Sequence, residues 1–172
     1  MSSLSQFDPN TTPVHFTAAQ IALVVATLLY FAMNGAQIFE TAVLVPKWTA
    51  SPPGSFGLFR GPYAIDLKTF WIAAHSVHEV SMLAAIVLCW KLDVRNVLLC
   101  VLCLHFLVRV WTLTYFAPEI ISFQRIAETG EVALDLVRRV TLWKWLNGVR
   151  VAAFVALSLA MLAASVRALR VQ

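Results

Sequence analysis

The stretch from Phe70 to Trp90 reads FWIAAHSVHEVSMLAAIVLCW, an apolar run that is long enough to cross a membrane as a helix. A helix of about 20 residues spans roughly 30 Å of hydrocarbon. The same run contains His75, His78 and Glu79, which are ionisable side chains that are costly to place in lipid. The stretch therefore predicts a transmembrane helix with a functional site on one of its faces.

Three further apolar runs of similar length occur in the chain. We predict four transmembrane helices at residues 18–45, 68–90, 97–116 and 142–166, in a single membrane domain that covers residues 1–172. The chain is 60% hydrophobic and 13% charged, with a mean hydropathy of +0.77. Soluble domains are about half apolar and a quarter charged, so the composition argues against a soluble enzyme. The expected fold is an all-α bundle of four transmembrane helices.

The segments between the predicted spans differ in character. Residues 46–66 are rich in proline and glycine and predict a loop. Residues 118–141 mix apolar side chains with acids and arginines, and Gly130 is expected to split them into two amphipathic helical pieces that lie at the membrane interface. Residues 1–15 form a polar tail, after which Thr17 is a candidate helix cap.

The net charge of +4 bears on the orientation in the membrane. With four spans, both termini and the turn at 91–96 share one side, which carries the basic residues Lys91, Arg95, Arg167 and Arg170. The longer loops on the other side hold more basic residues. However, Arg95 and Arg167 flank their spans tightly, which favours cytoplasmic termini by the positive-inside rule. We therefore expect a multi-pass membrane protein with both termini in the cytoplasm.

Polar residues recur in every predicted span at spacings of three or four, which places them on one stripe of each helix. In chain order they are Asn34, Gln37, Glu40, His75, His78, Glu79, His105, Arg109, Thr112, Asn147 and Arg150. At the helical rise, the ionisable ones lie about 9 to 19 Å from the same membrane face. Four antiparallel helices should bring these side chains into one polar layer inside the bundle.

A metal site is the first interpretation of this layer. We expect Glu40, His75, Glu79 and His105 to be the ligands, because imidazole and carboxylate together suit iron, copper, zinc or manganese. His78 is expected to support the site or to act as an extra ligand. Haem held between His105 and His75 or His78 is an alternative cofactor.

Two interpretations without a metal use the same residues. In one, Glu40 and Glu79 neutralise Arg109 and Arg150, while the histidines hydrogen-bond across helices as packing contacts. In the other, a histidine acts as a base on a lipophilic acid and an arginine stabilises the resulting anion. The pairing of acids with arginines is compatible with all three interpretations.

Several motifs resemble a known family. They are Gly35-Ala-Gln-Ile-Phe-Glu40, Val45-Pro-Lys-Trp48, Thr112-Leu-Thr-Tyr-Phe-Ala-Pro118 and Trp145-Leu-Asn147-Gly-Val-Arg150. Together they resemble the anthrone-oxygenase-like family of small four-helix integral membrane proteins, over about residues 35–164. The name of that family comes from proteins that oxidise anthrones to anthraquinones with dioxygen. The resemblance implies roles for Glu40, Asn147 and Arg150. The rich set of histidines departs from the family pattern and favours a dedicated metal site.

The function expected from these features is that of a membrane oxidase or oxygenase for a lipophilic, aromatic small molecule that reaches the site from the lipid. Arg109, Arg150 and Asn147 would orient an oxygen-rich substrate or stabilise a developing oxyanion, and His78 would assist. The rival is a non-enzymatic binding, transport or assembly subunit with a structural polar layer. The expected partners are the lipid bilayer and the small molecule. A homo-oligomer is compatible with the sequence, and no nucleic-acid motif is present.

Overall fold

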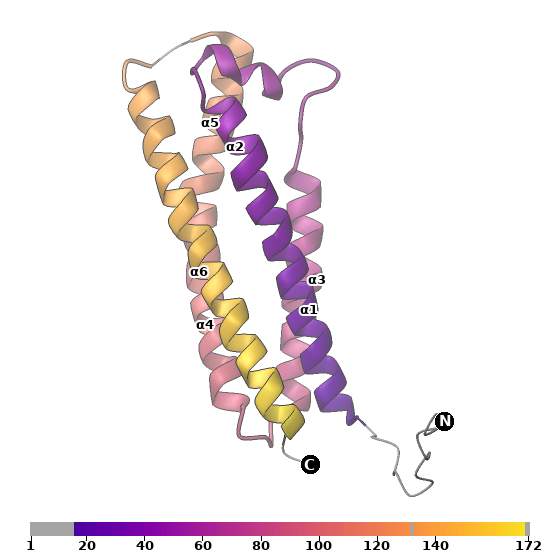
Figure 1. The fold of residues 1–172 in the computed structure, drawn as a ribbon. Coiled ribbons are helices and arrows are strands. Elements are labelled where there is room, and N and C mark those ends of the chain that lie inside the picture. The colour runs from indigo at the N-terminus through magenta and orange to yellow at the C-terminus, as the bar shows by residue number, and fades with distance from the viewer. Residues whose placement is uncertain (1–15, 132, 171–172) are drawn as a thin grey trace, which may run out of the picture.

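The computed structural model describes residues 16–131 and 133–170, and all regular secondary structure in these residues is helical. Four long helices pack side by side as a bundle (Figure 1). Each is long and apolar enough to cross a membrane, and they cover Ala18–Trp48, Lys68–Leu88, Arg95–Thr129 and Leu136–Arg170. The predicted all-α bundle of four membrane-spanning helices is thus confirmed, and the chain is a multi-pass membrane protein.

Two of the four long helices contain a π-helical segment. The elements in order are α1 (Ala18–Phe39), the π-helix η1 (Glu40–Leu44), α2 (Val45–Trp48), the 3₁₀-helix η2 (Gly54–Phe59), α3 (Lys68–Leu88), α4 (Arg95–Trp111), the π-helix η3 (Thr112–Phe116), α5 (Ala117–Thr129) and α6 (Leu136–Arg170). Helices α1, η1 and α2 form the first long helix, and α4, η3 and α5 form the third. In the bundle, α1 contacts α3 and α6, and α4 contacts the same two helices.

The first helix begins where the sequence predicts. The Thr17 hydroxyl accepts a hydrogen bond from the backbone N–H of Gln20 at 3.3 Å, and the Gln20 side chain accepts one from the Thr17 N–H at 2.9 Å. Such a reciprocal capping box satisfies backbone donors at the start of the helix. The Gln20 amide also donates to the Ala168 carbonyl of α6 at 3.0 Å. The first and last described residues therefore lie at the same end of the bundle (Figure 1); the predicted tail at residues 1–15 lies outside the described ranges.

Gly130 ends a helix, as expected, but the pieces on either side of it are not separate short helices. Its φ of +72° suits glycine, and its N–H bonds to the Ile126 carbonyl at 2.9 Å. Helix α5 continues α4 through η3, while α6 already begins at Leu136, so these pieces prolong the third and fourth helices (Figure 1). Pro118 does not end its helix, which continues through it directly after the π-helix η3.

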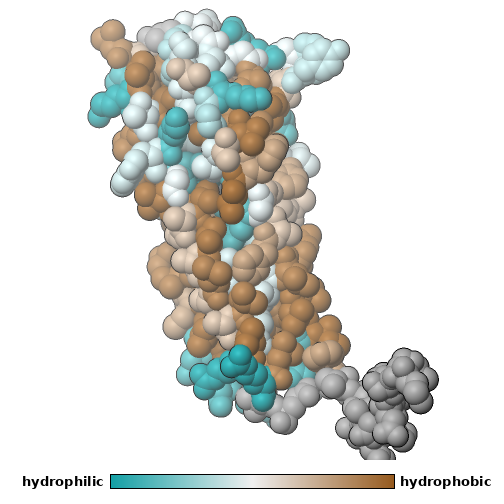
Figure 2. All heavy atoms as spheres, in the orientation of Figure 1, coloured by the Kyte–Doolittle hydropathy of each residue, from teal (hydrophilic) through white to brown (hydrophobic). Residues whose placement is uncertain are grey.

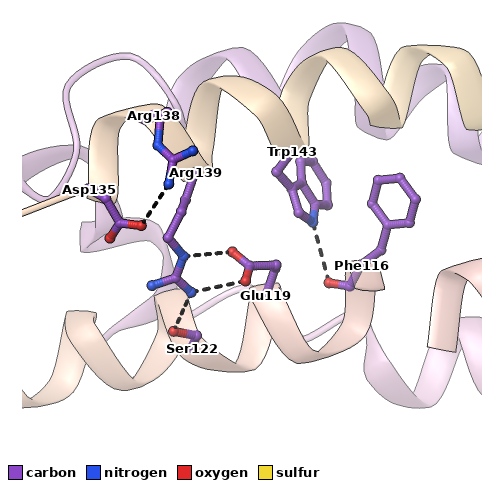
Figure 3. Close-up of polar contacts among 7 residues, drawn as sticks. All are labelled: Phe116, Glu119, Ser122, Asp135, Arg138, Arg139 and Trp143. Carbon is purple, nitrogen blue, oxygen red and sulfur yellow. Dashed lines mark hydrogen bonds and ion pairs between the residues drawn. The ribbon is translucent and has the colours of Figure 1, made fainter. Parts of the chain in front are cut away.

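Helices α5 and α6 are clamped together at the end of the bundle opposite the termini (Figure 3). Arg139 donates to both carboxylate oxygens of Glu119, at 3.0 and 3.1 Å, and to the Ser122 hydroxyl at 2.9 Å. One turn further along α6, the indole N–H of Trp143 donates to the Phe116 carbonyl at 3.3 Å. A bidentate arginine–carboxylate pair fixes the relative position of the two helices more firmly than a single contact does.

The buried apolar side chains form two separate clusters. The terminal-end core contains Leu23, Ala26, Tyr30, Met33, Met82, Ala85, Ile86, Cys89, Val94, Leu98, Val101, Phe154, Leu157, Met161, Ala164 and Ala168. The loop-end core contains Val45, Trp48, Phe56, Phe116, Phe123, Ile126, Ala127, Leu136, Val140 and Trp143. Outside these two cores most of the buried residues are polar. The outer surface is apolar along much of the bundle, with hydrophilic residues concentrated toward its two ends (Figure 2).

Candidate functional site

Helix α3 supplies two side chains of the candidate site from one face. His75 and Glu79 are four residues apart, just over one helical turn, so they project in nearly the same direction. His75 is 5% exposed, and the side chain of Glu79 is 25% exposed. This arrangement, which the sequence spacing predicts, presents an imidazole and a carboxylate toward the bundle interior.

Helix α4 brings a second histidine to this pair. His105 is fully buried, and its Nε2 lies 3.7 Å from Oε1 of Glu79. One ligand atom each from His75, Glu79 and His105 lies within 4.8 Å of the others. Two imidazoles and one carboxylate at this spacing form a set that can hold a transition metal and leave coordination positions open. We call these three residues the ligand group.

Arg109 lies one helical turn beyond His105 and contacts the same carboxylate. Its Nε donates to Oε1 of Glu79 at 3.0 Å, with an exposure of 18% for the arginine side chain. The carboxylate oxygen nearest His105 is thus already hydrogen-bonded to a positive charge. The layer therefore combines the predicted ligands with the predicted acid–arginine pairing.

Tyr30 of α1 is a member of the site that sequence reasoning missed. Its hydroxyl lies 3.0 Å from Nδ1 of His105, and its ring centroid is 4.2 Å from that of His78. The residue is fully buried. The available signal was its position four residues before Asn34, on the polar stripe of α1, but a tyrosine there is equally typical of core packing.

Aromatic rings surround the two histidine ligands. Phe154 of α6 lies 5.3 Å from the ring centroid of His105 and 6.3 Å from that of His75. Trp71, one turn before His75 on α3, lies 5.7 Å from the His75 ring. The contacts of Phe154 were not foreseen, because which helices face each other is not encoded in a single stretch of sequence. They restrict the orientation of both imidazoles.

His78, the predicted supporting residue, lies beside the ligand group rather than in it. Its ring packs 4.2 Å from Tyr30 and 5.0 Å from His105, measured between centroids. Both of its ring nitrogens are buried and have no hydrogen-bond partner among the residues that the structure describes. His78 is therefore placed as a packing neighbour of His105.

Glu40, the predicted fourth ligand, does not join the ligand group. It is the first residue of the π-helix η1, and within the described ranges it forms no ion pair within 4.0 Å. Its neighbour in η1, Thr41, contacts Asn147 of α6. The prediction placed Glu40 by depth alone, whereas at this level the first long helix contacts α6 through Thr41 and Asn147, away from the ligand group.

Asn147 and Arg150 form a second polar group with α1. The Asn147 amide donates to the Thr41 hydroxyl at 3.0 Å, and Nη2 of Arg150 donates to Oδ1 of Asn147 at 2.6 Å. The Arg150 guanidinium also stacks over the Phe116 ring, 4.4 Å from its centroid. Arg150 is therefore held on two sides, and its Nε is buried without a partner in the described part of the chain.

Asn34 and Gln37 line the interior between these two groups. The Asn34 amide donates to the Phe154 carbonyl at 3.2 Å, which ties α1 to α6 beside the histidines. The Oδ1 of Asn34 and the Oε1 of Gln37 are buried and lack protein partners among the described residues. Buried polar atoms of this kind usually bind ordered water or a ligand. The predicted layer thus exists as two adjoining polar groups between the two apolar cores.

Comparison with protein-family models, with curated proteins and with solved structures finds no significant match to this chain.

Proposed function

We propose that this chain is an integral membrane oxidoreductase that oxidises a lipophilic, aromatic small molecule with dioxygen at a transition metal held by His75, Glu79 and His105. The observation that carries the proposal is the ligand group itself. Three ligand atoms from two helices lie within 4.8 Å of one another, inside a bundle whose exterior is apolar. Ionisable side chains at such a depth usually mark a functional site, because they are costly in lipid.

The ligand chemistry favours iron among the candidate metals. Two histidines and one carboxylate with open positions are the donor set of non-haem iron(II) oxygenases, although copper, zinc and manganese also accept these ligands. Iron would supply the activation of dioxygen. Tyr30, His78 and Phe154 pack around His105 and thereby favour a single ion over a flat haem.

The resemblance to the anthrone-oxygenase-like family supports a reaction that needs no separate reductant. In such a reaction an activated methylene group becomes a carbonyl group. One oxygen atom of dioxygen enters the product, and the other leaves as water with the two hydrogens of the methylene. Loss of the first proton leaves an oxyanion on the aromatic substrate. Arg109 and Arg150 are the positive groups of the layer that can stabilise this charge, and Asn147 holds Arg150 in place.

A second candidate function rests on the contact between Glu79 and Arg109. Their 3.0 Å ion pair neutralises the carboxylate without any metal. In this case the polar layer serves packing, and the protein is a binding, transport or assembly subunit of the membrane.

Elemental analysis of the purified protein separates the two candidates. We expect about one equivalent of a transition metal in the wild type, with loss of the metal in His75→Ala and in His105→Ala. His78→Phe is the matched control, since it removes a neighbouring histidine of the same helix but keeps an aromatic ring against Tyr30 and His105. This variant should retain the metal.

A folded wild-type protein that binds none of the four metals after reconstitution would contradict the enzymatic proposal. The structural candidate then predicts that Glu79→Ala destabilises the bundle, because Arg109 loses its partner. A visible absorption spectrum of the same sample tests for haem, which would give an intense Soret band.

A further inference from the structure

The formal charges of the polar layer balance only without a metal. The described part of the layer contains two carboxylates, Glu40 and Glu79, and two guanidinium groups, Arg109 and Arg150. Histidines that bind a metal through a ring nitrogen are neutral. A divalent ion in the ligand group therefore leaves the layer with two surplus positive charges, which is unfavourable in an apolar interior.

Arg109 is the group that the ion affects most directly. A metal on Glu79 binds the carboxylate on which Arg109 depends, and the Oε1 atom that faces His105 is also the acceptor of the Arg109 hydrogen bond at 3.0 Å. With a metal–oxygen bond of about 2.1 Å, the ion on this oxygen would lie within about 5 Å of the guanidinium Nε. The single negative charge of Glu79 would then be shared between a divalent ion and a guanidinium group, so a net positive charge remains at this point.

Arg150 supplies a second hydrogen-bond donor to the same interior. Its Nη2 is occupied by Asn147, but its Nε is buried and has no acceptor in the described residues. Arg150 belongs to the polar group that adjoins the ligand group, where its guanidinium stacks over the Phe116 ring. The buried Nε of Arg150 can therefore donate a hydrogen bond to an anion that enters the layer.

We infer that the metal-loaded site binds a small organic oxyanion, a carboxylate or a phenolate, at an open coordination position, with Arg109 and Arg150 as its counter-charges. The inference rests on the proposed function, because the charge surplus arises only when the ligand group holds a metal. It adds the class of ligand that the site selects: an anionic oxygen donor in preference to a neutral molecule of the same shape. The oxyanion provides Arg109 with a negative partner in place of the Glu79 carboxylate, whose charge the metal neutralises.

Cobalt(II) and a matched pair of aromatic probes test this inference. The purified protein in detergent is loaded with Co²⁺, whose visible d–d bands report its ligands, and is titrated with benzoate and separately with benzamide. Benzamide has nearly the same size and ring but no charge. We expect benzoate to shift the d–d bands in a saturable manner and benzamide to leave them unchanged. Benzoate should bind about tenfold more weakly to Arg109→Gln and to Arg150→Gln. Lys144→Gln, which removes an exposed positive charge from α6, should behave as the wild type.

The outcomes distinguish this inference from the metal proposal on which it rests. If the wild type shows Co²⁺ bands but benzoate has no effect, or no more effect than benzamide, the metal site stands and the oxyanion site is wrong. Equal benzoate affinity in the wild type and both arginine variants also overturns the inference. If no Co²⁺ bands appear in folded protein, both proposals fail. The wild-type comparison of the two probes does not depend on whether the arginine variants fold.

Discussion

In the proposed metal site, the Tyr30 hydroxyl would decide which nitrogen of His105 is available to the metal. It lies 3.0 Å from Nδ1, so Nε2 is the nitrogen left to face Glu79. A hydrogen bond to the far nitrogen of a metal-binding histidine fixes the tautomer and the orientation of the ring. We therefore expect Tyr30 to be a positioning residue that acts through His105.

Replacing this tyrosine with phenylalanine should weaken metal binding while leaving the fold in place. In Tyr30→Phe the ring still packs on His78, but His105 loses its hydrogen bond. We expect the affinity for Co²⁺ to fall about 10- to 100-fold, the range typical of lost supporting hydrogen bonds at metal sites. Titration of the d–d bands measures this change. Tyr63→Phe, at a residue that is 95% exposed, is the control and should bind Co²⁺ as the wild type does. Unchanged affinity in Tyr30→Phe would refute the positioning role.

Replacing a glutamate of the layer with glutamine should affect metal binding differently at its two positions. Glu79→Gln removes the anionic ligand of the group and should abolish stoichiometric metal binding. Glu40→Gln lies outside the ligand group and should retain the metal. Elemental analysis of both variants makes the comparison. Loss of the metal in Glu40→Gln would show that Glu40 is a fourth ligand, as the sequence suggested.

Residue by residue, the sequence predicts the site in part. The spacing of His75 and Glu79, and that of His105 and Arg109, predicts their shared faces correctly because helical periodicity is local. Glu40 was misplaced because depth along a helix does not say which neighbouring helix a side chain meets.

At the scale of elements, each of two helices contains a π-helix followed closely by a proline. Segment η1 (Glu40–Leu44) precedes Pro46, and η3 (Thr112–Phe116) precedes Pro118. Proline lacks an N–H and its ring crowds the carbonyl of the preceding turn, which a locally wider helix relieves. The predicted spans end at residues 45 and 116, just before these prolines. The helices instead continue through them, and the spans are longer than predicted. Sequence patterns alone do not distinguish a proline that ends a helix from one that a π-segment accommodates.

The clamp between α5 and α6 can be measured with a double-mutant cycle. Glu119→Gln, Arg139→Gln and the double variant should give a coupling free energy of about 1 kcal/mol, at the upper end for partly exposed pairs, because the contact is bidentate. Thermal unfolding in detergent provides the measurement. The neighbouring pair Asp135–Arg138, at 3.4 Å and largely exposed, is the control, and its coupling should be near zero. Equal coupling in the two cycles would show that the bidentate geometry contributes nothing.

For the molecule as a whole, the number of spans and their antiparallel order followed from the sequence, because a membrane demands long apolar helices. The division of the interior into two apolar cores could not be predicted from the sequence. Two apolar cores separated by polar residues depend on which side chains meet across helices, and those contacts join residues far apart in the chain, such as Tyr30 and His105. Both described ends of the chain lie at the same end of the bundle, so they lie on the same side of the membrane (Figure 1).

The positive-inside rule predicts that this end faces the cytoplasm. A fluorescent protein that matures only in the cytoplasm, fused after Gln172, should therefore fluoresce in intact cells. The variant Tyr63→Cys, in the loop at the opposite end, should react with a membrane-impermeant maleimide added from outside. The wild type is the control for background labelling of Cys89, Cys100 and Cys103. If the fusion protein does not fluoresce and Tyr63→Cys is labelled no more than the wild type, the termini face the opposite side of the membrane.

The separation of the two cores has a mechanical consequence. Since no continuous apolar packing joins them in the described part of the chain, a disturbance at one membrane surface reaches the other along the four helix backbones or through the hydrogen bonds between the cores. At mid-depth the helices are therefore held to one another by hydrogen bonds, such as those of Asn34 with Phe154 and of Asn147 with Thr41, more than by interlocked hydrocarbon.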